Sequence, residues 1–459
     1  MIDTMRKVSP EDLLQPLLLQ LALILTAARV CAWLARRVGQ PAAVGEIAAG
    51  LALGPSLFGE LAPGLFAAVF RPEVAGLPPD ASDVLLVKIL AVLAQLGLVL
   101  LMFLIGLEFD FGHLVADSRA VVLVSALGAA IPFAMGFGLG WLMHPLVTAG
   151  QEREIPPLAF CLFIGTALSV TAVPVLGRMM MEWGIARTRL AAVVVSAAAF
   201  QDAAGWVLLA SVAAAAGRPG HVGAFGMIAG AVLFTAVMVL AVRPLVSRLG
   251  RRMLSGDGEL GVGGLAALLV LLFLSAAATG LIGIFAILGA FLLGAVLSGE
   301  VGLREAAGRR IRDFVTAFFL PVFFACTGLR TDIGTLNTWT MAGLAVAVTA
   351  AAVVGKVGGC GLAAWCAGRG WRESACVGVL MNTRGLMELV VVNVGRDLGV
   401  IPDTVYCMLV LMALATTLMT APLLHWLARG TELDAPMRAG ERGQTASRSP
   451  VEPLTPSPA

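Results

Sequence analysis

Charged residues and tyrosine are scarce in this chain. Of its 459 residues only 13% are charged, 59% are hydrophobic, and there is a single tyrosine. About a quarter of the residues of a soluble globular protein are charged, so this composition excludes an ordinary water-soluble domain. The apolar residues also form long runs, and about 20 such residues suffice to cross a bilayer as a helix. The composition therefore predicts an integral membrane protein.

Residues that build metal and redox centres are few and scattered. The seven cysteines and four histidines show no metal-ligand spacing and no disulfide framework. We therefore expect no cofactor, and we interpret the cysteines as small apolar packing residues. The net charge is only +2 and no basic run is interleaved with aromatic residues, so nucleic acid is not an expected partner.

Long apolar stretches bounded by charges, proline or glycine recur along the chain. They give thirteen candidate spans, at about residues 13–35, 42–58, 84–107, 120–143, 156–181, 188–214, 222–243, 259–278, 281–299, 312–329, 338–366, 373–396 and 403–428. No stretch shows the alternation of a β-strand, and a single span in lipid must satisfy its own backbone hydrogen bonds. The sequence thus predicts an all-α integral membrane fold.

Positive charges are unevenly distributed over the loops between these spans. With the N-terminus outside, the inner loops carry sixteen arginines, whereas the outer loops and the N-terminal segment carry seven basic residues at most. Because Lys and Arg gather on the cytoplasmic side, we expect a multi-pass protein of the plasma (inner) membrane with a cytoplasmic C-terminus. Residues 429–459 contain few apolar residues, which predicts a disordered cytoplasmic tail.

Two charged residues lie deep inside predicted spans, where a charge is costly and therefore marks a candidate functional site. Asp202 lies near the middle of span 188–214, where its carboxylate can hold either a proton or a monovalent cation. A structural carboxylate tied to a neighbouring helix is the alternative. Lys356, among glycines in span 338–366, is the expected partner of Asp202, and a purely structural ion pair is again the alternative.

Further polar residues in the spans are expected to brace or gate the protein. Arg384 and Glu388 are four residues apart, which places them on one face of a continuous helix. Asn382 and Thr383 directly precede Arg384. Glu46, in span 42–58, is a weaker candidate with a structural or lining role.

Two spans contain helix-breaking residues at their centres. The middle of span 156–181 holds Ser169, Thr171 and Pro174, and proline removes a backbone donor. The middle of span 373–396 is the polar run 381–385, which ends in glycine. The two spans are seven apart and so have opposite orientations, as an inverted repeat requires. Such paired interruptions indicate an ion site at mid-membrane, and two ordinary kinked helices are the alternative.

Together these motifs resemble the monovalent cation:proton antiporter-2 family, with its sodium/hydrogen exchanger-type transmembrane domain, and most closely the plant cation/proton exchanger-like branch. The order and spacing of several stretches carry the resemblance: residues 45–55, 104–108, 169–174, 201–202, 323–329 and 372–389.

The resemblance implies an inverted-repeat sodium/proton antiporter fold of about 13 helices, with two crossed, broken helices, in a homodimer. A transmembrane domain would then occupy residues 1–428, with dimer scaffold spans at about 13–107 and 259–329, a linker span at 222–243, and core spans at about 120–214 and 338–428. Asp202 matches the ion-binding aspartate of the family, and Lys356 and Arg384 match its basic positions. Gln201 stands where electrogenic members carry a second acid, which implies electroneutral exchange.

The sequence supports three hypotheses, all for a transporter and none for an enzyme. The first is an antiporter that exchanges K+ or Na+ for H+ by elevator-like alternating access, with both ions competing for Asp202 and with Ser169, Thr171 and Gln201 as candidate ligands. The second is a sodium-coupled symporter for an organic solute, which would need a roomier cavity. The third is a potassium efflux system, against which the expected absence of a nucleotide-binding tail argues.

Overall fold

The structure, a computed structural model, describes residues 9–40, 42–72, 79–108, 118–149, 154–171, 176–177, 179–180, 183–185, 188–216, 224–246, 248, 259–282 and 286–438. Every regular element in this part of the chain is a helix, which confirms the predicted all-α fold. The first elements are α2 (Pro10–Arg37), α3 (Ala42–Leu53), η1 (Pro55–Gly59), α4 (Pro63–Phe70), α5 (Pro79–Glu108), α6 (Ser118–Val147), α7 (Pro157–Ser169), α9 (Arg189–Ala215), α10 (Ala224–Val237) and η3 (Met238–Val242). The others are α12 (Val262–Ile282), α13 (Ala286–Leu297), α14 (Val301–Phe314), η4 (Val315–Phe319), α15 (Leu320–Leu329), η5 (Ile333–Leu336), α16 (Trp339–Val353), η6 (Val354–Gly358), α17 (Gly359–Cys366), α18 (Trp371–Met381), α19 (Leu386–Leu398) and α20 (Asp403–Leu427).

Most of these helices have the length and composition of membrane spans. Within the described residues, ten helical segments are long and apolar enough to cross a membrane, and the apolar helices α7 and α13 are shorter. The predicted span 373–396 is divided between α18 and α19. The chain is therefore a multi-pass membrane protein, while the count of thirteen spans stays a prediction.

The helix ends follow local sequence rules. At the start of α2, the Ser9 hydroxyl accepts a hydrogen bond from the Glu11 amide at 3.3 Å, and the Asp12 carboxylate accepts one from the Ser9 amide at 3.1 Å. This reciprocal capping satisfies donors that the first turn of a helix leaves free. At the start of α16, the Thr338 hydroxyl accepts a single hydrogen bond from the Met341 amide at 3.2 Å.

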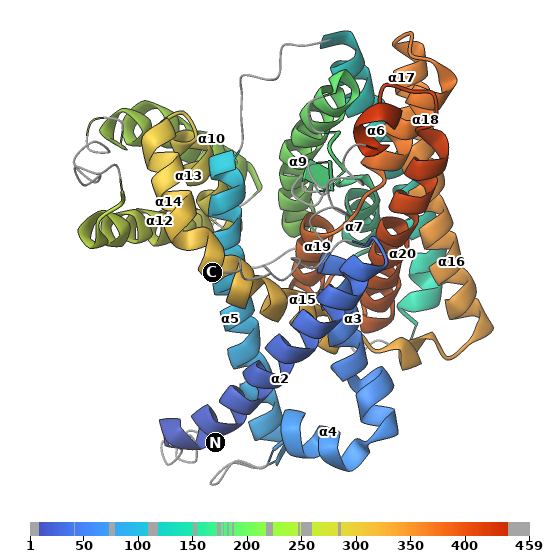
Figure 1. Cartoon of the computed structure of the whole chain (residues 1–459). Helices are drawn as coiled ribbons and strands as arrows, with labels where there is room; N and C mark the ends of the chain where they lie inside the picture. The colour runs from blue at the N-terminus through green and yellow to red at the C-terminus, as the bar shows by residue number, and fades with distance from the viewer. Residues whose placement is uncertain are drawn as a thin grey trace, which may run out of the picture.

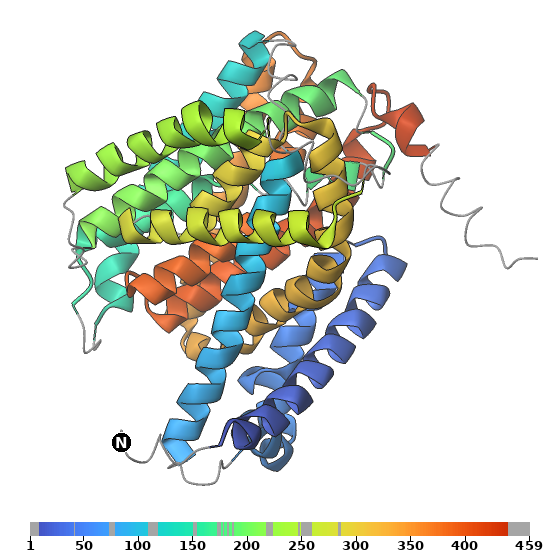
Figure 2. The same cartoon turned by 90° about the vertical axis from the view of Figure 1, so that its left-hand side faces the viewer.

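The helices form two groups that pack against each other (Figure 1). In the first group, α6 packs on α7, α9 and α17, and α20 packs on α16, α18 and α19. In the second, α5 packs on α13 and α15, and α3 packs on α2 and α15. Figure 2 views the molecule from the side of α10 and α12, which lie in front of α5. The candidate site lies inside the first group.

Glycines allow the closest helix contacts in the second group. A Cβ atom added at Gly106 of α5 would collide with the Phe291 backbone of α13, and one added at Gly294 of α13 would collide with the Phe103 backbone of α5. Membrane helices associate largely through such close packing, because lipid provides no hydrophobic drive between them. The two glycines therefore fix the distance between α5 and α13.

The C-terminal segment is ordered further than we expected. We predicted disorder from residue 429, yet residues 429–438 are described and pack against the first group of helices. Leu433 and Met437 are buried in a cluster with Leu190 and Leu427, and the Glu432 carboxylate accepts a hydrogen bond from the Leu190 amide at the start of α9. Residues 439–459 lie outside the described part of the chain.

Candidate ion-binding site

The first predicted break is present at the end of α7. The helix ends at Ser169, and Val170 has extended dihedral angles (φ −69°, ψ 149°). Ser169 and Thr171 are both buried. Pro174, the predicted breaking residue, lies outside the described residues. Ending the helix here leaves the carbonyl oxygens of its last turn without intrahelical partners.

The second predicted break separates α18 from α19. The helix α18 ends at Met381, residues 382–385 are irregular, and α19 begins at Leu386. Asn382, Thr383 and Arg384 are each buried, with at most 1% of their surface exposed. An irregular backbone at membrane depth is tolerated where protein surrounds it.

Arg384 joins the two breaks. Its Nη1 donates a hydrogen bond to the Ala167 carbonyl and its Nη2 donates one to the Leu168 carbonyl, both at 2.5 Å. The same guanidinium forms a buried ion pair with Glu388, also at 2.5 Å. A cation at the C-terminal end of α7 interacts favourably with the helix dipole, and the carbonyls gain partners. Arg384 therefore braces one broken helix against the other, although the helix is not continuous from Arg384 to Glu388.

Lys356 approaches the same helix end from another side. It lies in η6, a π-helical turn between α16 and α17, and is completely buried. Its ammonium donates to the Gly128 carbonyl at 3.0 Å, to Gln201 Oε1 at 2.8 Å, and to the Ser169 carbonyl. An ammonium group has three donors, so these acceptors satisfy it completely. The predicted pairing with Asp202 is wrong: among the described residues, no hydrogen bond or ion pair joins Asp202 to Lys356.

Gln201 uses its whole hydrogen-bonding capacity at this point. Its Oε1 accepts from Lys356 and from the Thr171 hydroxyl, both at 2.8 Å. Its Nε2 donates to the carbonyls of Val124 at 3.0 Å and Ser125 at 3.3 Å. Gln201 thus links α6, α9, η6 and the break after α7 without adding charge.

Asp202 differs from Lys356 and Gln201 because part of its carboxylate makes no hydrogen bond. The residue is 6% exposed, and its buried Oδ1 has no hydrogen-bond partner among the described residues. The buried Oδ1 of Asn382 is in the same condition. A buried acceptor without a donor is costly, and a proton or a cation removes that cost. Asp202 lies in α9 and Asn382 directly follows α18, and these two helices pack on each other.

Of the other predicted residues, Thr171 and Thr383 lie at the breaks, whereas Glu46 lies in the second group of helices. Thr171 reaches both Gln201 and, at 3.5 Å, the Met381 carbonyl beside the second break. Thr383 lies 3.5 Å from the Thr420 hydroxyl. Glu46 is buried in α3, whose main neighbours α2 and α15 belong to the second group of helices. The structure therefore gathers the predicted residues around the two breaks, with the exception of Glu46.

Sequence reasoning missed two contributors. Thr417 accepts a hydrogen bond from the Arg384 amide at 3.2 Å and donates one to the Arg384 carbonyl at 2.5 Å, so α20 supports the second break. Gly128 supplies a carbonyl to Lys356. The hydroxyls at 416, 417 and 420 inside an apolar span were the available signal for Thr417. For Gly128 the signal was Pro132, four residues later in α6, because proline has no N–H to donate to the Gly128 carbonyl.

The sequence profile of the transmembrane sodium/hydrogen exchanger family matches residues 24–429, almost the whole described chain. The chain belongs to this family. Its members are transporters rather than enzymes, and the resemblance inferred from the motifs is confirmed.

Named relatives extend the comparison. The Na+/H+ antiporter NhaS4 of Synechocystis is 35% identical over 407 residues, which cover 89% of this chain and 96% of that protein. The cation/H+ antiporter 19 of Arabidopsis thaliana is 33% identical over 94% of this chain, and the K+/H+ antiporter 1 of Saccharomyces cerevisiae is 31% identical over 84% of it. The chain spans about half the length of these two eukaryotic relatives, 52% and 43%.

A solved structure confirms the fold. The sodium proton antiporter MjNhaP1 from Methanocaldococcus jannaschii matches with a TM-score of 0.58 over 92% of this chain and 100% of that chain, at 15% identity. This exchanger is therefore an all-helical protein of the sodium/proton antiporter fold, with its two breaks brought together by Arg384.

Proposed function

We propose that this exchanger is an antiporter that moves one monovalent cation, K+ or Na+, against one H+, with both ions competing for the Asp202 carboxylate. The observation that carries the proposal is the buried Asp202 Oδ1. It has no hydrogen-bond partner among the described residues, whereas Lys356 is fully bonded to other acceptors. Relatives that are named for Na+/H+ and for K+/H+ exchange both support the class, and they leave the cation as K+ or Na+.

The charges of the site favour electroneutral exchange. Arg384 and Glu388 cancel each other, and Gln201 is neutral, so Asp202 and Lys356 carry the remaining charges. Protonated Asp202 and cation-loaded Asp202 leave the site with the same net charge. A site that carries either one proton or one cation therefore moves no net charge in a complete cycle.

The arrangement also supports a moving core. The helices α6, α7, α9 and α16 to α20 hold both breaks and all the residues around Lys356, and they pack as one group. We propose that this group carries Asp202 across the membrane relative to a scaffold of α2, α3, α5 and α12 to α15, in a homodimer in the plasma (inner) membrane with the N-terminus outside.

Transport in proteoliposomes tests this function. Vesicles loaded with K+ and diluted into buffers with Na+, K+, Rb+ or Li+ should show cation-dependent proton flux, which a pH-sensitive dye reports. The flux should be unchanged when valinomycin clamps the membrane potential at different values, because no net charge moves. A flux that follows the imposed potential would contradict electroneutrality, and cation flux without proton flux would contradict exchange.

A further inference from the structure

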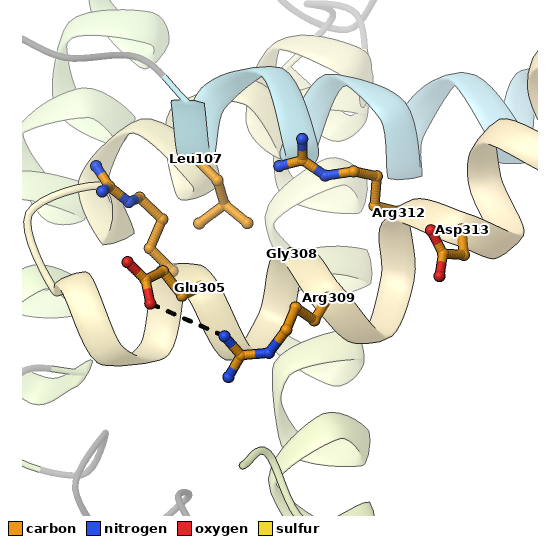
Figure 3. Close-up of a pocket in the computed structure, with 7 residues that line it drawn as sticks. Leu107, Glu305, Gly308, Arg309, Arg312 and Asp313 are labelled. Atoms are coloured by element: carbon orange, nitrogen blue, oxygen red, sulfur yellow. Dashed lines mark ion pairs between the residues drawn. The ribbon is translucent and has the colours of Figure 1, made fainter. Parts of the chain in front are cut away.

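Two cavities of the protein differ in which helices line them. A pocket of about 650 Å³ lies between α14 and the end of α5 (Figure 3), and all its lining residues belong to the proposed scaffold. A smaller cavity, of about 40 Å³, is lined by α5 and α15 of the scaffold and by α19 of the proposed moving core. The smaller cavity therefore lies in the interface along which the core has to move.

Hydrogen bonds between buried side chains cross this interface. Asn393 Nδ2 of α19 donates to the Thr327 hydroxyl of α15 at 3.0 Å. The Tyr406 hydroxyl of α20 lies 3.2 Å from the Thr327 carbonyl and 3.1 Å from Asn393 Oδ1, so its single proton serves one of these two acceptors at a time. Thr327 and Tyr406 are at most 1% exposed. Separating the two groups of helices here leaves buried polar atoms without partners, which is costly.

A second layer of contacts, nearer the ends of α15 and α19, contains charged residues. Gln95 Nε2 of α5 donates to Asp397 Oδ2 at 3.2 Å. The Asp397 carboxylate also approaches the Arg330 guanidinium to 3.8 Å, and Arg396 Nη1 donates to the Arg330 carbonyl at 3.2 Å. The side chains of Asp397 and Arg330 are 42% and 23% exposed, so water weakens their attraction. The buried layer therefore holds the interface more firmly than this one.

Both layers lie on one side of the ion site. The second break ends where α19 begins at Leu386, and Asn393 follows seven residues later, about 10 Å along the helix at 1.5 Å per residue. Asp397 lies about one turn further on, just before α19 ends at Leu398. In the proposed orientation, with the N-terminus outside, this end of α19 faces the outer surface. The contacts therefore lie between the second break and the outer side of the membrane.

We propose that Thr327, Asn393 and Tyr406 form a latch that closes the ion site towards the outer side, with the contacts around Asp397 as a second, weaker layer. The latch presupposes the moving core of the proposed function, because it has to open in every cycle that brings Asp202 to the outer side. Its strength sets the balance between a closed and an open interface. A weaker latch shifts this balance towards the open interface, while the residues gathered around the two breaks keep their contacts.

The single tyrosine of the chain makes the latch directly observable. In protein produced with 3-fluorotyrosine, Tyr406 gives the only fluorine-19 NMR signal of the full chain. The closed and the open latch should give two signals, or one averaged signal between them. Thr327→Val removes the hydroxyl that accepts from Asn393 and changes the shape of the side chain little. This variant should raise the ratio of open to closed latch by about three- to tenfold, the factor that corresponds to one net hydrogen bond.

Two further variants control for misfolding and for unspecific loss of a hydroxyl. Gln95→Leu changes an exposed residue of the outer layer and should shift the signal in the same direction by a smaller amount. Thr279→Val removes a buried hydroxyl that bonds to carbonyls of its own helix, α12, and should leave the signal unchanged. A signal that neither Thr327→Val nor Gln95→Leu changes would overturn the latch. An equal change in Thr279→Val would also overturn it.

The same signal separates the latch from the exchange mechanism. Thr327→Val combined with Asp202→Asn should shift the tyrosine signal as Thr327→Val does alone, although coupled exchange is lost. Coupled exchange that persists in Asp202→Asn, together with this shift, would contradict the proposed function and leave the latch standing. Normal exchange in the native chain, together with a signal that Thr327→Val does not change, would contradict the latch alone.

Discussion

Lys356 donates a hydrogen bond of 2.8 Å to Gln201 and none to Asp202, although Gln201 and Asp202 are neighbours in α9. Consecutive residues of a helix point about 100° apart, so one of the two faces Lys356 while the other faces elsewhere. The lysine is therefore held by a neutral amide and two carbonyls. Asp202, the only acid in α9, is left with no hydrogen-bond partner at its buried Oδ1 among the described residues.

Lys356→Ala should destabilise the protein and abolish coupled exchange. The substitution takes the lysine donor from the buried carbonyls of Gly128 and Ser169 and leaves Gln201 Oε1 with Thr171 as its remaining donor. Each orphaned acceptor costs about 1–3 kcal/mol, so the loss should be on the order of 3 kcal/mol or more. Thermal unfolding in detergent measures it, with Lys88→Ala, an exposed lysine, as the matched control. A Lys356→Ala variant as stable as the control, with normal cation affinity, would remove Lys356 from the mechanism.

Arg384→Ala should impair assembly and stability at least as much as cation affinity. It leaves Glu388 as a buried unpaired charge and frees the Ala167 and Leu168 carbonyls. Removing one partner of a buried ion pair costs about 3–5 kcal/mol.

A double-mutant cycle isolates the ion pair from these carbonyl contacts. In Arg384→Ala/Glu388→Ala the charge imbalance disappears, so the loss of stability should be smaller than the sum of the single losses. Strict additivity, or a stable Arg384→Ala variant that differs only in cation affinity, would assign Arg384 to the binding site instead of the brace.

Two truncations of the C-terminal segment should show that residues 429–438 stabilise the fold and that the residues after Arg438 do not. A chain that ends at Arg438 should unfold at the native temperature, whereas one that ends at Ala428 should lose stability, because Leu433 and Met437 are buried and Glu432 caps α9. Leu433→Ala alone should cost about 2–5 kcal/mol, the usual cost of truncating a buried leucine. Equal unfolding temperatures for the two truncated chains would show that residues 429–438 contribute nothing.

The same segment should respond to acid. The Gly430 amide, followed by Arg438, lowers the pKa of Asp434 below its usual value. A lowered folded-state pKa stabilises the fold above the unfolded value, near pH 4, and this contribution is lost as the pH falls through the folded value. The native chain should therefore lose a small stability advantage over Asp434→Asn below about pH 4. An advantage that is the same at pH 3 and pH 7 would contradict this.

Much of the fold could be predicted from the sequence, because lipid imposes simple rules on span length and backbone hydrogen bonding. The predicted first span, 13–35, lies inside α2 (Pro10–Arg37), and the polar run 381–385 contains the gap between α18 and α19, residues 382–385. The order of residues 429–438 could not be predicted from their composition. The few apolar residues there include Leu433 and Met437, which are four residues apart, share one helix face and are buried.

The partners inside the site could not be predicted. The sequence shows that Lys356 and Asp202 are both deep in the membrane, but depth does not determine which side of α9 faces η6. Only the packing of α6, α7 and α9 shows that Gln201 takes that position. Pro132 likewise indicates that the Gly128 carbonyl lacks its helical donor, but it does not indicate that Lys356 donates to that carbonyl instead.

The central claim is that one proton and one cation compete for Asp202. The most direct measurement is the apparent cation affinity for proton-coupled flux in proteoliposomes, taken at several pH values for the native chain and for Asp202→Asn. While the site is mostly protonated, each unit fall in pH should raise the apparent cation constant by up to about tenfold, or about 1.4 kcal/mol in binding free energy. Asp202→Asn should remain folded and show no coupled exchange, because the amide keeps the shape of the side chain but cannot titrate. Coupled exchange that persists in Asp202→Asn, or a native cation affinity that does not change with pH, would contradict the account.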